Sequence, residues 1–186
     1  MKIYSLDERY VNYLQKFDSR VCISKLDQAF GRKYVGAVFK VNELEYFAPL
    51  SSKIKKKHFT DVCLYDEKTR TYIGSVKLNN MIPLPTKHKQ LLKTIDFNAL
   101  KLSKELADRQ YGTLLEKQYI KLNDVSIKFE ILSKAQKFYR SYRFNPKLKM
   151  LCCDFQLLEQ KALEFSLSKD KKRKNYRTRR RVSEID

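Results

Sequence analysis

The sequence is poor in several residues on which common enzyme sites depend. It has four glycines, two histidines and no tryptophan, and neither Gly-x-x-x-x-Gly-Lys-Ser/Thr nor Gly-x-Gly-x-x-Gly occurs. ATP- and NAD-dependent chemistry is therefore disfavoured. It also lacks His-Glu-x-x-His, Cys-x-x-Cys and any compact carboxylate cluster, so we expect no metal site and no cofactor.

Long apolar runs and a cysteine framework are missing as well. No stretch approaches 18 apolar residues, and the acidic residues after Ser5 interrupt any signal-peptide pattern, so we expect no membrane association and a cytoplasmic location. The four cysteines are scattered, apart from the vicinal pair Cys152 and Cys153. Reduced thiols in the cytosol explain this spacing better than disulfides do.

Positive charge is what the chain has in excess. Forty Lys and Arg against 21 Asp and Glu give a formal net charge of +19, and the natural partner of such a protein is a polyanion. Nine of the basic residues lie between Lys169 and Arg181, but residues 1–168 remain strongly basic without them. We therefore expect a folded, positively charged nucleic-acid surface on one domain, 1–168, followed by a basic and disordered tail, 169–186.

The hydrophobic pattern predicts strands followed by helices. Asp7 is placed to cap a helix through Phe17, and two hairpins follow, over residues 34–50 and 59–78. Pro83 and Pro85 predict a loop reaching residue 95. Helices are expected over 100–121, over 125–142 and around Phe155 to Leu163. This segregation favours an α+β fold, a twisted antiparallel sheet with surrounding helices.

The densest candidate site is Ala48-Pro-Leu-Ser-Ser-Lys-Ile-Lys-Lys-Lys-His58, where a predicted strand runs into two serines, four lysines and a histidine. Hydroxyls donate hydrogen bonds to phosphate oxygens, and lysines supply positive charge. An ordinary solvated basic turn fits the same pattern. Because Arg32 and Lys33 precede the first long strand, the hairpin can bring either of them near Ser51 and Ser52.

RNA cleavage without a metal is within the reach of such residues. The neighbouring 2′-hydroxyl attacks phosphorus while donors stabilise the developing negative charge and protonate the leaving oxygen. Tyr139-Arg-Ser-Tyr-Arg143 mixes aromatic and basic residues on an expected helix and is a further candidate RNA contact, although a solvated basic face explains it somewhat better. His88 is expected to be a bystander.

Several blocks together resemble the ToxN/AbiQ toxins of type III toxin–antitoxin systems, which are also phage abortive-infection proteins. They are Tyr10-Val-Asn-Tyr-Leu-Gln-Lys-Phe-Asp18, Arg32-Lys-Tyr-Val-Gly36, Tyr46-Phe-Ala-Pro-Leu-Ser-Ser52, Met81-Ile-Pro83, Leu114-Leu-Glu-Lys-Gln118 and Cys153-Asp-Phe-Gln-Leu-Leu158. The resemblance spans most of the chain and leaves out the basic tail.

The resemblance implies a sequence-specific, metal-independent endoribonuclease toxin that leaves a cyclic phosphate and a 5′-hydroxyl. It also implies a tandem-repeat RNA antitoxin, which the toxin cuts and binds in ring-like assemblies, cellular or phage RNA substrates, and no protein antitoxin. The implied catalytic residues are Arg32, Ser51, Ser52 and either Lys53 or Lys55. The residues expected to bind RNA are Lys33, Tyr34, Lys56, Lys57, His58, Lys77, Arg140 and Arg143.

Two alternatives to a ribonuclease remain. A noncatalytic RNA-binding or ribosome-associated protein would share the charge, the aromatic content and the tail, and only the Ala-Pro-Leu-Ser-Ser block favours an enzyme. A DNA-binding regulator would need a recognition helix, whereas the basic cluster here follows a strand.

Overall fold

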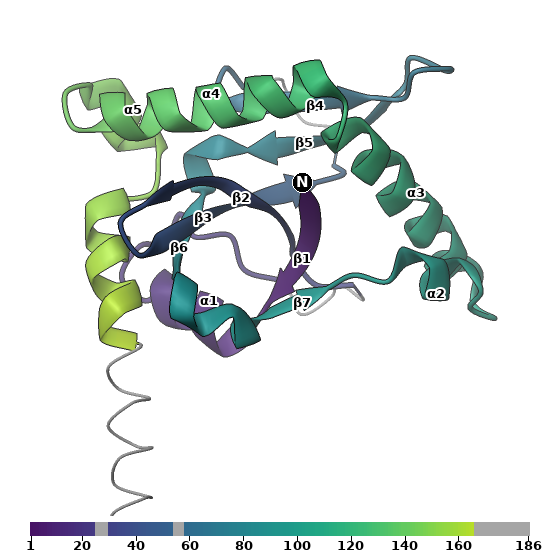
Figure 1. Cartoon of the computed structure of the whole chain (residues 1–186), viewed down its shortest axis with the longest axis horizontal. Coiled ribbons are helices and arrows are strands. Elements are labelled where there is room, and N and C mark those ends of the chain that lie inside the picture. Colours follow the sequence, from purple (N-terminus) through teal and green to yellow (C-terminus); the bar gives the residue numbers. More distant parts are fainter. Residues whose placement is uncertain (25–29, 54–57, 166–186) are drawn as a thin grey trace, which may run out of the picture.

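The computed structural model describes residues 1–24, 30–53 and 58–165. The predicted basic tail lies outside these residues. Seven strands form one antiparallel sheet in the order β4-β5-β3-β2-β1-β7, with β6 pairing to β3 beside this path. Helices surround the sheet (Figure 1). The predicted α+β class is confirmed.

The N-terminal elements are β1 (Lys2–Leu6) and α1 (Glu8–Gln15). As predicted, Asp7 caps α1, because its carboxylate accepts a hydrogen bond from the Arg9 backbone N–H. Strand β1 is absent from the sequence prediction. It pairs with both β2 and β7, so it joins the N-terminus to the middle of the sheet.

Both predicted hairpins are confirmed. The first consists of β2 (Lys33–Val41) and β3 (Leu44–Ser51), and the second of β4 (Asp61–Tyr65) and β5 (Tyr72–Lys77). Their turns contain Asn42 and Arg70, each with positive φ. Strand β3 also pairs with β5, so its final residue, Ser51, lies between β2 and β5.

The predicted loop between residues 83 and 95 is wrong. Residues 78–94 instead form η1 (Leu78–Asn80), β6 (Ile82–Pro85), η2 (Thr86–Leu91) and β7 (Leu92–Thr94). The prolines are tolerated because β6 pairs with β3 alone, so their missing N–H groups interrupt no second ladder. The buried Tyr10 hydroxyl donates a hydrogen bond to the Pro83 carbonyl.

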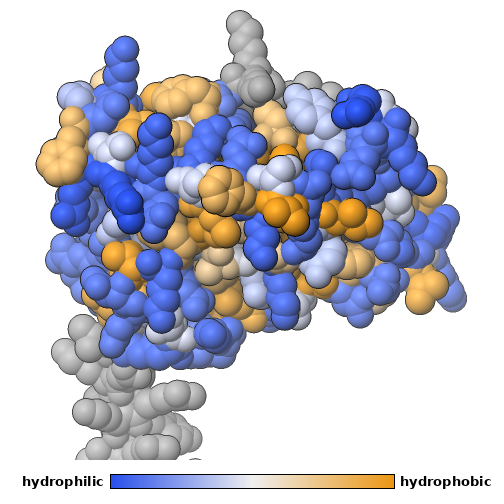
Figure 2. Space-filling model, turned by 45° about the horizontal axis from the view of Figure 1, so that its top comes forward, coloured by the Kyte–Doolittle hydropathy of each residue, from blue (hydrophilic) through white to orange (hydrophobic). Residues whose placement is uncertain are grey.

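The helices largely follow the prediction. The expected helix over 100–121 is divided into α2 (Phe97–Lys101) and α3 (Leu106–Leu122), whereas α4 (Val125–Tyr142) has the expected bounds. Helix α5 (Pro146–Leu151) is additional, and a further helix covers residues 155–165. Figure 2, turned to bring the α4 side forward, shows hydrophilic residues over most of this face, with apolar ones between them.

The core lies between the sheet and the helices. Among its largest fully buried side chains are Tyr10, Tyr34, Tyr46, Phe47 and Phe155. The hydroxyls of Tyr46 and Tyr139 both donate 2.7 Å hydrogen bonds to Glu159 Oε1, which ties the last helix to α4 and β3. These contacts hold one end of the β2–β3 hairpin and leave its other end, at Arg32 and Ser51, to form the site.

Candidate active site

The β2–β3 pairing brings the two predicted halves of the site together. Lys33 is the register partner of Leu50, so the next residues outward, Arg32 and Ser51, lie across from each other where the hairpin ends. Residues nearly twenty positions apart in the sequence thus share one edge of a rigid sheet. This was the arrangement expected from the sequence.

A small cavity of about 250 Å³ opens at this edge. It is lined by Phe30, Gly31, Arg32, Lys33, Leu50, Ser51, Ser52, Lys53 and Tyr111. Four of the residues expected to be catalytic are therefore in one place, namely Arg32, Ser51, Ser52 and Lys53. Lys55, the alternative lysine, lies outside the described residues.

Arg32 is fixed through its backbone, whereas one of its side-chain donors makes no hydrogen bond. Its backbone N–H donates a 2.7 Å hydrogen bond to Ser24 Oγ, which fixes the start of β2. Its Nε is buried and has no hydrogen-bond partner within the described parts of the chain. Because a buried donor without a partner is costly, and guanidinium groups match phosphate geometry, this N–H suits a phosphate ligand.

Lys33 lines the same cavity, and its partly buried position lowers the pKa of its side chain. Its ammonium donates a hydrogen bond to the Phe30 carbonyl and sits 5.9 Å from the centroid of the Tyr111 ring. Desolvation by burial lowers the pKa of Lys33, and the nearby Glu8 carboxylate partly opposes this shift. A lysine of lowered pKa can give up a proton more readily than an exposed one.

Tyr111 is a site residue that the sequence analysis missed. It comes from α3, and its ring stacks on Phe30 with centroids 4.1 Å apart and an interplanar angle of 18°. Burial raises the pKa of its hydroxyl to about 12, which keeps it protonated at neutral pH. No pattern in the sequence marks Tyr111, because only the packing of α3 beside the hairpin brings it to the cavity.

Two residues expected to bind RNA are engaged in contacts within the protein, and their role in RNA binding stays a prediction. The Tyr34 ring is only 1% exposed, and its hydroxyl donates a 2.7 Å hydrogen bond to the Cys22 carbonyl. Lys77 forms an ion pair with the buried carboxylate of Asp61. Tyr34 belongs to the core and also borders a cavity, and Lys77 is the register partner of Asp61 on β4.

Three further predicted RNA contacts, His58, Arg140 and Arg143, are described by the structure and do not line the cavity. His58 Nδ1 lies 2.6 Å from Thr60 Oγ1, and the His58 ring tilts against Phe59. Arg140 and Arg143 are exposed at the C-terminal end of α4, where Tyr139 packs on Phe39 and Tyr46, toward the other end of the hairpin. Lys56 and Lys57 lie outside the described residues.

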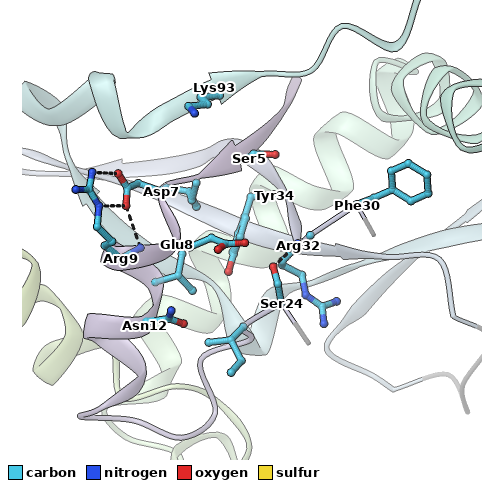
Figure 3. A pocket seen from close by; sticks show the side chains of 14 residues that line it. Ser5, Asp7, Glu8, Arg9, Asn12, Ser24, Phe30, Arg32, Tyr34 and Lys93 are labelled. Carbon is cyan, nitrogen blue, oxygen red and sulfur yellow. Dashed lines mark hydrogen bonds and ion pairs between the residues drawn. The ribbon is translucent and has the colours of Figure 1, made fainter. Parts of the chain in front are cut away.

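A second, larger cavity of about 870 Å³ adjoins the first. Phe30, Gly31 and Arg32 line both cavities, and residues of β1, α1 and β7 complete the larger one (Figure 3). The site is therefore a small cationic pocket with hydroxyl donors beside a wider hollow lined by both polar and apolar side chains. Such a pair can hold a phosphate and a neighbouring group of the same ligand.

Three further features of the described residues concern metal binding, the cysteines and membrane spans. Residues 1–24, 30–53 and 58–165 contain no group of three or more His, Cys, Asp or Glu side chains arranged to hold a metal ion. The four cysteines, all of which lie in the described ranges, form no disulfide, and Cys152 and Cys153 are buried as predicted. Within the same ranges, each helix is either too short or too polar to cross a bilayer.

Comparison with known proteins places these features in a family. A family model described as "Toxin ToxN, type III toxin-antitoxin system" matches residues 2–163. Endoribonuclease ToxN of Bacillus thuringiensis subsp. kurstaki is 35% identical over 173 residues, which cover 88% of this chain and 84% of that protein. Endoribonuclease AbiQ of Lactococcus lactis subsp. lactis is 28% identical, with 89% of this chain and 90% of AbiQ covered.

Solved structures agree with the sequence comparisons. A type III toxin described as selectively inhibited by a non-coding RNA pseudoknot superposes with a TM-score of 0.77 at 33% identity, covering 89% of this chain and 97% of that one. The structure of AbiQ, described as a lactococcal anti-phage endoribonuclease, gives a TM-score of 0.73 at 28% identity, with coverages of 89% and 97%. The chain therefore belongs to the ToxN family of type III toxin–antitoxin toxins.

Proposed function

We propose that this protein is a sequence-specific endoribonuclease that cleaves RNA without a metal ion, by attack of the 2′-hydroxyl on the adjacent phosphorus. The observation that carries the proposal is the convergence of Arg32, Ser51, Ser52 and Lys53 on one cavity beside the partly buried Lys33. The names of the relatives, endoribonucleases ToxN and AbiQ, support the same activity.

The cavity offers the groups that this reaction needs. The buried Arg32 Nε and the serine hydroxyls donate hydrogen bonds to the nonbridging oxygens, where negative charge grows in the transition state. Lys33, with its lowered pKa, protonates the leaving 5′-oxygen, and Lys53 offsets the phosphate charge. The 2′-hydroxyl gives up its proton to solvent water as its oxygen bonds to phosphorus, and the bond between phosphorus and the 5′-oxygen breaks. A cyclic phosphate and a 5′-hydroxyl are left.

The proposed partner is an RNA antitoxin of tandem repeats, which the toxin processes and then binds in ring-like assemblies. The net charge of +19 suits a folded RNA lying over the cavity. One related toxin is described as inhibited by a non-coding RNA pseudoknot, and another related structure belongs to an antiviral system regulated by a processed non-coding RNA. Cellular or phage RNA are the other substrates, the cytoplasm is the proposed location, and no protein antitoxin is required.

Cleavage in the presence of EDTA tests the activity, the metal independence and the site together. The wild-type protein and Ser52→Ala are incubated with a long RNA in EDTA, and the fragment ends are mapped. We expect discrete wild-type cuts with 5′-hydroxyl ends, which are lost in the variant. If the wild type binds the RNA and leaves it intact, the protein is instead a noncatalytic RNA-binding protein.

A further inference from the structure

The larger cavity contains a carboxylate that the proposed reaction does not use. Glu8, at the start of α1, lines this cavity together with Asn12, Ser24 and Arg32. In Figure 3 the Glu8 side chain reaches toward the centre of the hollow, close to Tyr34 and Arg32. Its Oε1 lies 3.8 Å from the position that a Cβ atom on Gly31 would occupy, at the boundary with the smaller cavity.

Glu8 differs from its neighbouring acid in its contacts, because its interaction with the charged Lys33 is electrostatic and lacks a hydrogen bond. The Asp7 carboxylate accepts hydrogen bonds from the Arg9 side chain, at 2.8 Å from Nη2 and 3.2 Å from Nε. Glu8 makes no side-chain hydrogen bond and no ion pair with any residue that the structure describes. Since Arg9 is engaged, the cavity holds one carboxylate with its acceptor capacity unused.

A carboxylate beside an RNA site cannot serve the RNA backbone. Glu8 is exposed in the first turn of α1, where the helix dipole and Lys33 favour a negative charge, but it repels the phosphates that a protein of charge +19 otherwise attracts. Toward a bound RNA it therefore contributes favourably where it meets a hydrogen-bond donor. In single-stranded RNA, the donors are N–H groups on the base edges, and unpaired bases are commonly read through their Watson–Crick edges. Glutamate and aspartate accept hydrogen bonds from exocyclic amino groups in the same way in DNA recognition.

The size and lining of the cavity fit a base. Its volume of about 870 Å³ lies in the range of typical small-molecule sites, roughly 300–1,000 Å³. Asn12 adds an amide, which offers both a donor and an acceptor. Because Gly31 and Arg32 line both cavities, a nucleotide here would be attached directly to the phosphate in the smaller one.

We propose that this larger cavity binds the base of a nucleotide adjacent to the scissile phosphate, and that Glu8 selects bases carrying an amino group, namely adenine, cytosine and guanine, over uracil. Uracil offers a single N–H between two carbonyl acceptors, and these oppose the carboxylate. This inference rests on the proposed ribonuclease function and names the residue that sets its sequence preference.

Cleavage of a matched set of short RNAs tests the proposal. Each RNA carries one mapped cleavage site, with each of the four bases placed in turn at the two flanking positions. The proteins are the wild type, Glu8→Gln, and Glu43→Gln as the control. Glu43 is an exposed acid in the β2–β3 turn, at the opposite end of the hairpin, so the control makes the same charge change away from the site.

We expect the wild type and Glu43→Gln to prefer amino-bearing bases at one flanking position. Glu8→Gln should lower that preference over uracil by roughly tenfold at the same position, because a glutamine amide can also donate to a uracil carbonyl. An unchanged preference, or an equal loss of cleavage for all four bases, would overturn the proposal. Failure of the wild type to cut any of these RNAs would instead count against the ribonuclease function itself.

Discussion

The backbone N–H of Arg32 donates a 2.7 Å hydrogen bond to Ser24 Oγ, although Ser24 lies in the segment before β2 and outside the sheet. This bond fixes the backbone of Arg32, a residue that lines the cationic pocket, to the segment before β2. Gly31, between Ser24 and Arg32 in the chain, has φ +55, a conformation that favours glycine, and a Cβ there would lie 3.3 Å from Ser24 Oγ. The position of the Arg32 backbone thus depends on the Ser24 hydroxyl and on the conformation of Gly31.

Ser24→Ala should slow RNA cleavage by about threefold to tenfold without unfolding the protein, because one hydrogen bond, about 0.5–1.5 kcal/mol, is lost at the start of β2. Single-turnover rates and thermal melts measure the two effects. Ser133→Ala is the control, since the Ser133 hydroxyl only donates within α4. Equal rates for the two variants would show that this anchor does not position Arg32.

Tyr111→Ala and Tyr111→Phe should separate packing from proton transfer. Burial raises the pKa of the Tyr111 hydroxyl to about 12, so the hydroxyl is not a base at neutral pH. The contacts of Tyr111 in the site are those of its ring, which stacks on Phe30 and faces the Lys33 ammonium. We expect Tyr111→Phe to cleave at nearly the wild-type rate, and Tyr111→Ala to lose about tenfold. A large loss in Tyr111→Phe would instead assign a role to the hydroxyl.

The lowered pKa of Lys33 predicts a distinctive pH dependence of RNA binding. A charged Lys33 attracts phosphate, so affinity should fall as pH rises through its pKa in the free protein, which lies below the ordinary lysine value of 10.5. Lys33→Arg should move this loss to higher pH, because arginine stays protonated. Binding is measured with a 2′-deoxy oligonucleotide that cannot be cut, and coincident profiles for the two proteins would contradict the assignment.

Lys77→Met should affect folding rather than RNA binding. The substitution leaves the buried Asp61 carboxylate without its ion-pair partner, which should lower the free energy of unfolding by about 3 kcal/mol. Urea denaturation gives the stability, and filter binding under folding conditions gives the affinity. A stable variant with weakened RNA binding would restore the role that the sequence suggested for Lys77.

The elements with strong local signals could be predicted from the sequence. Asp7 before an apolar period of helical spacing gave α1, and alternating β-branched and aromatic residues gave the β2–β3 hairpin. The hairpin alone was enough to bring Arg32 and Ser51 together. Charge and motif therefore located the cationic pocket before any packing was known.

The missed features depend on tertiary context. The prolines of β6 predict a loop by local preference, yet an edge strand accommodates Pro83 and Pro85. The break before α3 follows from Ser103, whose hydroxyl accepts from the Glu105 N–H and donates to Asp108. Tyr111 and the Lys77–Asp61 pair required knowledge of which elements become neighbours, and this information is absent from local patterns.

The most direct test of the central claim is a single 2′-deoxy substitution at the nucleotide 5′ to a mapped cut. In EDTA, the wild-type protein should cleave the all-ribose RNA to a 2′,3′-cyclic phosphate and a 5′-hydroxyl, and should bind the substituted RNA without cutting it. Cleavage of the substituted RNA at the same bond, with a 5′-phosphate end, would contradict attack by the 2′-hydroxyl and the assignment of the pocket formed by Arg32, Ser51 and Ser52 to that reaction.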